Sequence, residues 1–179
     1  MINKQHGFTL LELVVVIVII SILGLFAIDR VLAIRVAAEQ AAIKQLVGTI
    51  KSALGLKVAQ LALEGKMPAV AKLDKSNPLL LLSQVPLNYI GEKDNSNGIT
   101  EPGIWYYHKN QNALIYNVRY SEGFETKLKG LPRIRYRIKL VYNDNNKNKR
   151  FDVRYDSIAG LDLFPIEKFS WNIKIENKL

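Results

Sequence analysis

A single carboxylate interrupts the most apolar part of the sequence. Between Phe8 and Ile28 nearly every side chain is apolar, and Glu12 is the only ionisable one among them. A carboxylate near the start of a membrane-spanning helix costs free energy, up to about 2.5–3.5 kcal/mol at mid-helix. If the chain is cut after Gly7, Phe8 carries a free ammonium group. The ammonium group of a neighbouring copy could then pair with Glu12 inside the membrane.

Residue types that perform catalysis are scarce. The chain has no cysteine and two histidines, His6 and His108, and His6 precedes the apolar run. Thiol nucleophiles and cysteine-ligated metals are therefore excluded. Cleavage after Gly7 would leave His108 as the one histidine, which excludes multi-histidine metal sites and argues against a histidine-dependent triad. No glycine-rich phosphate loop occurs. We expect no enzymatic activity, no metal site and no cofactor.

The apolar run has the length of a membrane span. Its 21 residues, 8–28, would rise roughly 31 Å as a helix, about the thickness of a bilayer core. Lys4 and the amino terminus favour a cytoplasmic N-terminus in the inner membrane, which places everything after the span in the periplasm. An uncleaved anchor carrying a monomeric binding module would show the same hydropathy, so this alternative remains open.

The helix is expected to continue well beyond the span. Apolar residues recur at spacings of three and four, as on an amphipathic helix: Ile43, Val47, Ile50, Leu54, Val58 and Leu61. Gly65, with Pro68 soon after, is a stop signal. We therefore expect one helix from Phe8 to Glu64, with two helices broken near Asp29 as the alternative.

The rest of the chain predicts a small β-rich head. Residues 66–103 read as an irregular connector with one short helix, which begins at Pro78 after the cap residue Asn77. Expected strands follow at 104–107, 113–120, 133–142, 150–155 and 169–175, the first two as a hairpin. The predicted fold is α+β: a long N-terminal helix packed on a C-terminal antiparallel sheet.

One expected strand carries a row of cations. Over 133–142 the apolar residues alternate with Arg133, Arg135, Arg137 and Lys139, which therefore share one face. The formal net charge of +9 agrees with an anionic partner. Such a row could follow phosphates and bind DNA, but a solvated sheet face is the interpretation that we favour. No recognisable nucleic-acid motif occurs in the sequence.

The N-terminal residues resemble a known signal. Gly7-Phe8-Thr9-Leu10-Leu11-Glu12, followed by Leu13-Val14-Val15-Val16, is similar to the cleavage and methylation signal of type IV prepilins and type II secretion pseudopilins. The resemblance implies cleavage between Gly7 and Phe8 by prepilin peptidase, N-methylation of Phe8, and a role for Glu12 in docking onto a growing filament. It also implies the pilin fold, other pilin or pseudopilin subunits as partners, and an assembly platform in the inner membrane.

Asp29 stands where many major pilins have a helix-loosening proline, which favours a minor subunit. We therefore expect a minor pilin or pseudopilin of a type II secretion or type IV pilus system, stored in the inner membrane and then polymerised. The filament would be periplasmic or on the surface. The expected division is a leader (1–7), a transmembrane helix (8–28), its amphipathic continuation (29–65), a connector (66–103) and a β head (104–179). A DNA-uptake pilin that binds through the basic strand face is the alternative.

Overall fold

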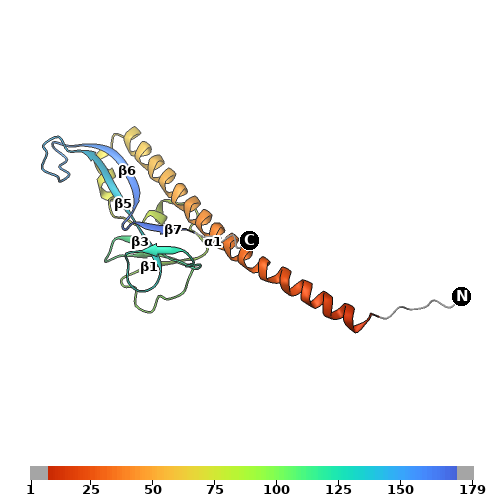
Figure 1. Cartoon of the computed structure of the whole chain (residues 1–179). Coiled ribbons are helices and arrows are strands. Elements are labelled where there is room, and N and C mark those ends of the chain that lie inside the picture. The colour runs from red at the N-terminus through yellow and green to blue at the C-terminus, as the bar shows by residue number, and fades with distance from the viewer. Residues whose placement is uncertain (1–7, 173–179) are drawn as a thin grey trace.

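The computed structural model describes residues 8–172 and consists of one long helix with a head packed on its second half (Figure 1). Helix α1 spans Leu10–Leu63, 54 residues, and so rises roughly 80 Å. The prediction of one continuous helix is confirmed, and there is no break near residue 29. Two short 3-10 helices follow, η1 (Met67–Leu73) and η2 (Pro78–Leu81).

Both ends of α1 are set by local sequence. Thr9 is the N-cap, and its hydroxyl accepts a hydrogen bond from the Glu12 amide at 3.2 Å. At the other end Gly65 adopts φ +69°, a left-handed conformation that costs glycine little. The amides of Gly65 and Lys66 then donate to Ala62 and Leu61 at 3.0 and 2.8 Å, which closes the last turn. The predicted stop at Gly65 is confirmed.

The head contains two sheets. The larger has the order β1-β2-β3-β5-β6, and the smaller pairs β4 with β7. The strands are β1 (Tyr89–Lys93), β2 (Trp105–His108), β3 (Ala113–Asn117), β4 (Phe124–Thr126), β5 (Arg133–Asn143), β6 (Ser157–Pro165) and β7 (Phe169–Trp171). Every pairing is antiparallel except that of β1 with β2, which is parallel. The predicted α+β fold, a long helix on a mostly antiparallel sheet, is therefore confirmed.

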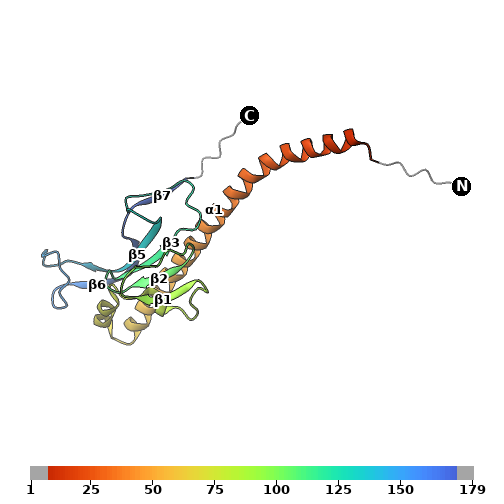
Figure 2. The ribbon, with the colours of Figure 1, turned by 90° about the horizontal axis from the view of Figure 1, so that it is seen from below.

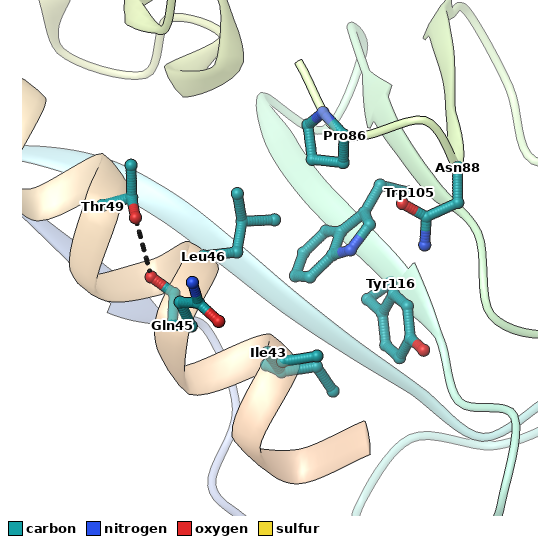
Figure 3. Close-up of a pocket in the computed structure, with 9 residues that line it drawn as sticks. Ile43, Gln45, Leu46, Thr49, Pro86, Asn88, Trp105 and Tyr116 are labelled. Atoms are coloured by element: carbon teal, nitrogen blue, oxygen red, sulfur yellow. Dashed lines mark hydrogen bonds between the residues drawn. The ribbon is translucent and has the colours of Figure 1, made fainter. Parts of the chain in front are cut away.

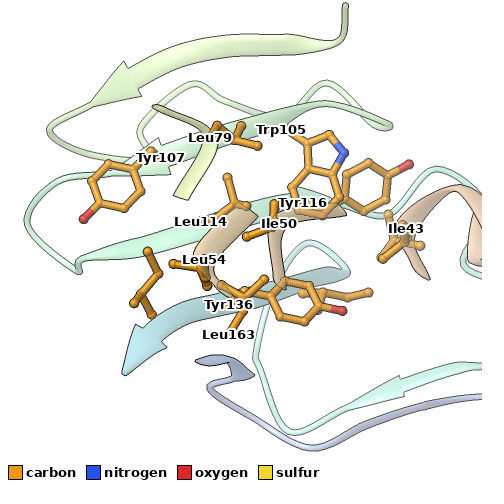
Figure 4. Packing of buried hydrophobic residues seen from close by; sticks show 13 residues of the cluster. Ile43, Ile50, Leu54, Leu79, Trp105, Tyr107, Leu114, Tyr116, Tyr136 and Leu163 are labelled. Atoms are coloured by element: carbon orange, nitrogen blue, oxygen red, sulfur yellow. The ribbon is translucent and has the colours of Figure 1, made fainter. Parts of the chain in front are cut away.

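The main core lies between α1 and the larger sheet (Figure 4). The helix contributes Ile50 and Leu54, which are fully buried, and the sheet contributes Leu114, Ile138 and Leu163. Each such side chain stabilises the fold by about 1.5–3 kcal/mol relative to exposure. Of the predicted apolar stripe, Ile43, Val47, Ile50 and Leu54 belong to this core. Across the sheet, Tyr106, Ala113 and Ile115 form a smaller cluster.

Several expectations about strands were wrong or incomplete. The strand expected at 113–120 ends at Asn117, as β3, and β4 was not predicted. Residues 150–155 do not form a strand, because Asp152 and Asp156 hydrogen-bond the local backbone amides and stabilise turns instead. The strand begins later, as β6. The connector carries an additional strand, β1, whose Gly91 and charged residues obscure its pattern. The last expected strand, 169–175, is observed as β7, which ends at Trp171. Residues 173–175 lie outside the described part of the chain.

Candidate functional site

The N-terminal half of α1 has no partner within the chain. From Leu10 to Arg35 the described side chains are mostly exposed, and Val36, at 1% exposure, is the first buried one among those described. Figure 2 shows this half of the helix extending clear of the head. By length and composition it can cross a membrane. A bare apolar helix of this length needs lipid or other helices around it.

Phe8 and Glu12 lie at the free end of this helix. Phe8 is 73% exposed, and Glu12 is exposed in the first helical turn, where the helix dipole favours a negative charge. Gly7, the other residue of the predicted cleavage site, lies outside the described residues. The two described residues thus lie four positions apart at the start of α1, with both side chains exposed.

A second carboxylate, Glu39, is buried where the helix enters the head. It is 8% exposed. One carboxylate oxygen accepts hydrogen bonds from the Tyr116 hydroxyl and the Arg119 amide, both at 2.7 Å, and the other accepts from the Tyr120 amide at 2.8 Å. Charge-assisted hydrogen bonds of this kind are strong. Glu39 therefore anchors the end of β3 and the turn after it to α1.

Sequence analysis did not identify Glu39. The available signal was its position, because it lies one turn before Ile43 on the same apolar stripe that packs against the sheet. An acidic residue on a buried stripe needs hydrogen-bond donors, but those donors come from residues about eighty positions later.

Burial also raises the pKa values of two tyrosine hydroxyls in this region. The pKa of the Tyr116 hydroxyl is raised well above its ordinary value, mainly by burial and then by its hydrogen bond to Glu39. Burial raises the pKa of Tyr136 to about 12. Both hydroxyls therefore remain neutral at physiological pH, and Tyr116 remains a donor to Glu39.

A groove opens beside the helix on the connector side (Figure 3). Its volume is about 270 Å³, and Trp105 and Tyr116 form its inner wall. Ile43, Gln45, Leu46 and Thr49 line it from α1, and Pro86 and Asn88 line it from the connector. Leu87, between these last two, is completely exposed. The groove is thus mainly apolar, with Gln45, Thr49 and Asn88 as its polar residues, and it is continuous with the exposed surface of the helix.

The basic row on β5 faces away from the helix, as its alternation predicts, but its cations are used by the head itself. Arg135 forms an ion pair with Glu167 and also donates to Gln111 at 2.8 Å. Arg137 donates to the carbonyl oxygens of Gln111 and Asn112. These contacts hold the β2–β3 turn and the segment after β6 against β5.

The two ends of the row are engaged as well. Arg133 donates to the carbonyl oxygens of Lys129 and Leu131, at 3.2 and 3.0 Å. The Lys139 ammonium lies 5.8 Å from the centre of the Phe164 ring. The predicted row therefore exists as a geometric feature, but each of its members already contacts another part of the head.

No arrangement for catalysis is visible in residues 8–172. His108 ends β2, is 5% exposed, and accepts a hydrogen bond from the Gln111 amide at 3.3 Å. Burial lowers the pKa of its imidazole. Among the described residues, no three His, Asp or Glu side chains lie together as a metal site would require.

Comparison with known proteins identifies the N-terminal segment. Residues 2–28 match the family model described as the prokaryotic N-terminal methylation motif. This match supports a pilin-type or pseudopilin-type subunit, a structural protein that assembles with others of its kind and is processed by prepilin peptidase. Together with the apolar helix, it is consistent with a single-pass membrane anchor.

Two further comparisons add little about the head. A stretch of 106 residues is 28% identical to the "Probable cation-transporting ATPase 1" of Plasmodium falciparum, and it covers 58% of this chain and 5% of that protein. The chain thus spans a very small part of that relative, and the likeness carries no function to it. No solved structure matches the chain significantly.

Proposed function

We propose that this protein is a minor pilin or pseudopilin, a structural subunit of a type II secretion or type IV pilus filament. The observation that carries the proposal is the bare apolar half of α1, with the methylation motif at its free end. Of the two systems, the cysteine-free head favours type II secretion. We place the leader at 1–7, the transmembrane helix at 8–28, its continuation at 29–65, the connector at 66–103 and the β head at 104–179.

Assembly would proceed by exchange of partners around the apolar helix. The subunit is stored in the inner membrane with its N-terminus cytoplasmic and its head periplasmic. After cleavage, the Phe8 ammonium of one subunit pairs with Glu12 of another, which offsets the cost of a carboxylate in an apolar environment. Neighbouring helices then replace lipid around the apolar residues as the subunit enters a periplasmic or surface filament.

The exposed face of the second half of α1 also supports helix packing between subunits. Small residues recur there at alternating spacings of three and four, interrupted once by glutamine: Ala38, Ala41, Gln45, Gly48, Ser52, Gly55, Ala59 and Ala62. All of them are exposed. This is the spacing of a seam between two helices, and small side chains allow close approach. We call these eight residues the small-residue seam.

The head does not explain the two glycines of the seam. A Cβ atom built at Gly48 or Gly55 would meet nothing within 4 Å. Each glycine nevertheless costs a helix about 1 kcal/mol relative to alanine. A second helix packed on the seam would account for both residues, and the groove beside Gln45 continues the same surface.

Enlarging the seam should therefore block assembly without harming the subunit. We expect the double variant Gly48→Leu/Gly55→Leu to fold at least as stably as the wild type, because helix propensity improves. It should enter filaments poorly, since the larger side chains prevent close approach. Filament fractions sheared or extracted from cells measure this. Gly48→Ala/Gly55→Ala is the matched control and should assemble nearly normally; normal assembly of the leucine variant would exclude the seam as a contact.

Processing tests the proposed family role most directly. In cells that contain prepilin peptidase, we expect the mature chain to begin at Phe8 and to carry an N-methyl group. Gly7→Leu should leave the leader attached, whereas His6→Ala should not. Mass spectrometry of the intact protein measures both changes. A wild-type chain that retains Met1 in such cells would contradict the proposal and favour a simple membrane anchor.

A further inference from the structure

The loop at residues 144–156, which joins β5 to β6, projects from the head as the end of a two-stranded ribbon. The ribbon is paired as far as Asn143 and Ser157. Figures 1 and 2 both show the loop at the end of the head that lies farthest from the N-terminus of α1. We call residues 144–156 the distal loop.

The three carboxylates of the distal loop accept hydrogen bonds from backbone amides of the same loop. Asp144 accepts hydrogen bonds from the amides of Asn148 and Lys149, at 3.2 and 2.7 Å. Asp156 accepts from the amides of Asn145 and Asp152, at 3.0 and 2.8 Å. Asp152 accepts from the Arg154 amide at 3.0 Å. The three carboxylates are partly buried and stabilise one loop conformation.

The four cations of the loop point outward instead. They are all exposed: Lys147, Lys149, Arg150 and Arg154. Within the described residues, the ion pairs of the head involve other cations, and no side-chain hydrogen bond is made by these four. Lys147 and Lys149 also have positive φ angles of 57° and 61°, which are unusual for non-glycine residues.

This arrangement differs from that of the basic row on β5. There the guanidinium groups of Arg133, Arg135 and Arg137 hydrogen-bond to the head. In the distal loop the acidic groups are bound internally and the basic groups are free. The surface that is available to an anionic partner is therefore the loop, although the sequence analysis placed that possibility on the strand.

We propose that the distal loop binds the phosphate backbone of duplex DNA. This inference concerns the head alone and goes beyond the role of the chain as a filament subunit. Apart from Val153, the exposed side chains are Lys, Arg and Asn with Tyr155, which is 60% exposed, and side chains of these types donate to phosphates in DNA complexes. The major groove is wide enough to admit a two-stranded β-ribbon.

Two other anionic surfaces fit less well. The membrane that holds the apolar half of α1 lies at the opposite end of the molecule, well beyond the roughly 10 Å over which exposed charges interact in physiological salt. A second copy of the chain carries the same formal charge of +9, so its head would repel the loop. An acidic protein is the remaining alternative, and the competition experiment below distinguishes it from DNA.

The test is a salt titration of duplex binding by the full chain in a non-ionic detergent, measured by fluorescence anisotropy with a labelled duplex of about 20 base pairs. Four phosphate contacts predict that affinity falls roughly 100-fold between about 50 and 200 mM salt. The variant Lys147→Gln/Lys149→Gln/Arg150→Gln/Arg154→Gln should bind about tenfold or more weakly at the lower salt concentration, with a much shallower salt dependence.

A second variant controls for net charge. Lys72→Gln/Lys127→Gln/Lys129→Gln/Lys168→Gln removes four exposed lysines elsewhere and should retain the affinity of the wild type. Equal weakening of both variants, or no wild-type binding at about 50 mM salt, would overturn the proposal. Competition by polyglutamate as effective per charge as that by DNA would also overturn it, in favour of an acidic protein partner. None of these results depends on filament assembly.

Discussion

Replacing Glu39 with alanine should destabilise the head by about 3–5 kcal/mol. The change leaves the buried Tyr116 hydroxyl and the partly buried amides of Arg119 and Tyr120 without their acceptor. Urea unfolding of the full chain in detergent measures this change. Both tryptophans, Trp105 and Trp171, lie in the head, so tryptophan fluorescence reports its unfolding without a contribution from the membrane helix.

Glu39→Gln separates the hydrogen bonds from the charge. Its single amide oxygen can still accept from Tyr116 and Arg119, but its NH₂ group would face the Tyr120 amide, which is also a donor. We expect a smaller loss, about 1–3 kcal/mol. Glu122→Ala, in the same turn but exposed, is the control and should change stability by less than about 0.5 kcal/mol. An unchanged unfolding midpoint for Glu39→Ala would exclude the anchoring role.

Replacing Glu12 with valine should leave the subunit in the membrane but remove it from filaments. Insertion should become more favourable because a carboxylate is lost from the apolar segment. Cleavage should continue, since the cut lies upstream. Loss of a charge-assisted hydrogen bond of about 1.5–3 kcal/mol predicts a roughly 10- to 100-fold weaker association with neighbouring subunits. Glu12→Gln, which keeps the size but not the charge, should also fail if pairing with the Phe8 ammonium matters.

Cross-linking can measure this association in either filament system. The chain has no cysteine, so Ser21→Cys introduces a unique thiol into the bare half of α1. A bis-maleimide reagent and a similarly labelled partner subunit should give an adduct with Glu12 present and little adduct with Glu12→Val. Equal amounts of adduct with Glu12 and with Glu12→Val would show that Glu12 has no role in assembly and would refute the proposed pairing.

The two carboxylates illustrate what kind of information each part of the sequence contains. The role proposed for Glu12 rests on neighbours within one helical turn and on a run of apolar residues, both of which are visible in the sequence. The end of α1 at Gly65 and the outward alternation on β5 were predictable for the same reason. In each case a short segment determines its own conformation through backbone preference or through the periodicity of its side chains.

Only the tertiary structure showed what Glu39 binds, that β1 is parallel to β2, and which cations are free. Each of these depends on groups that are far apart in the chain and become neighbours on folding. Arg135 and Lys149 are both basic residues in a polar, basic stretch of the sequence. In the structure Arg135 forms an ion pair with Glu167, whereas Lys149 is exposed to solvent on the projecting loop. The local sequence determined the helix and its signal, whereas long-range packing decided which charges remain available to a partner.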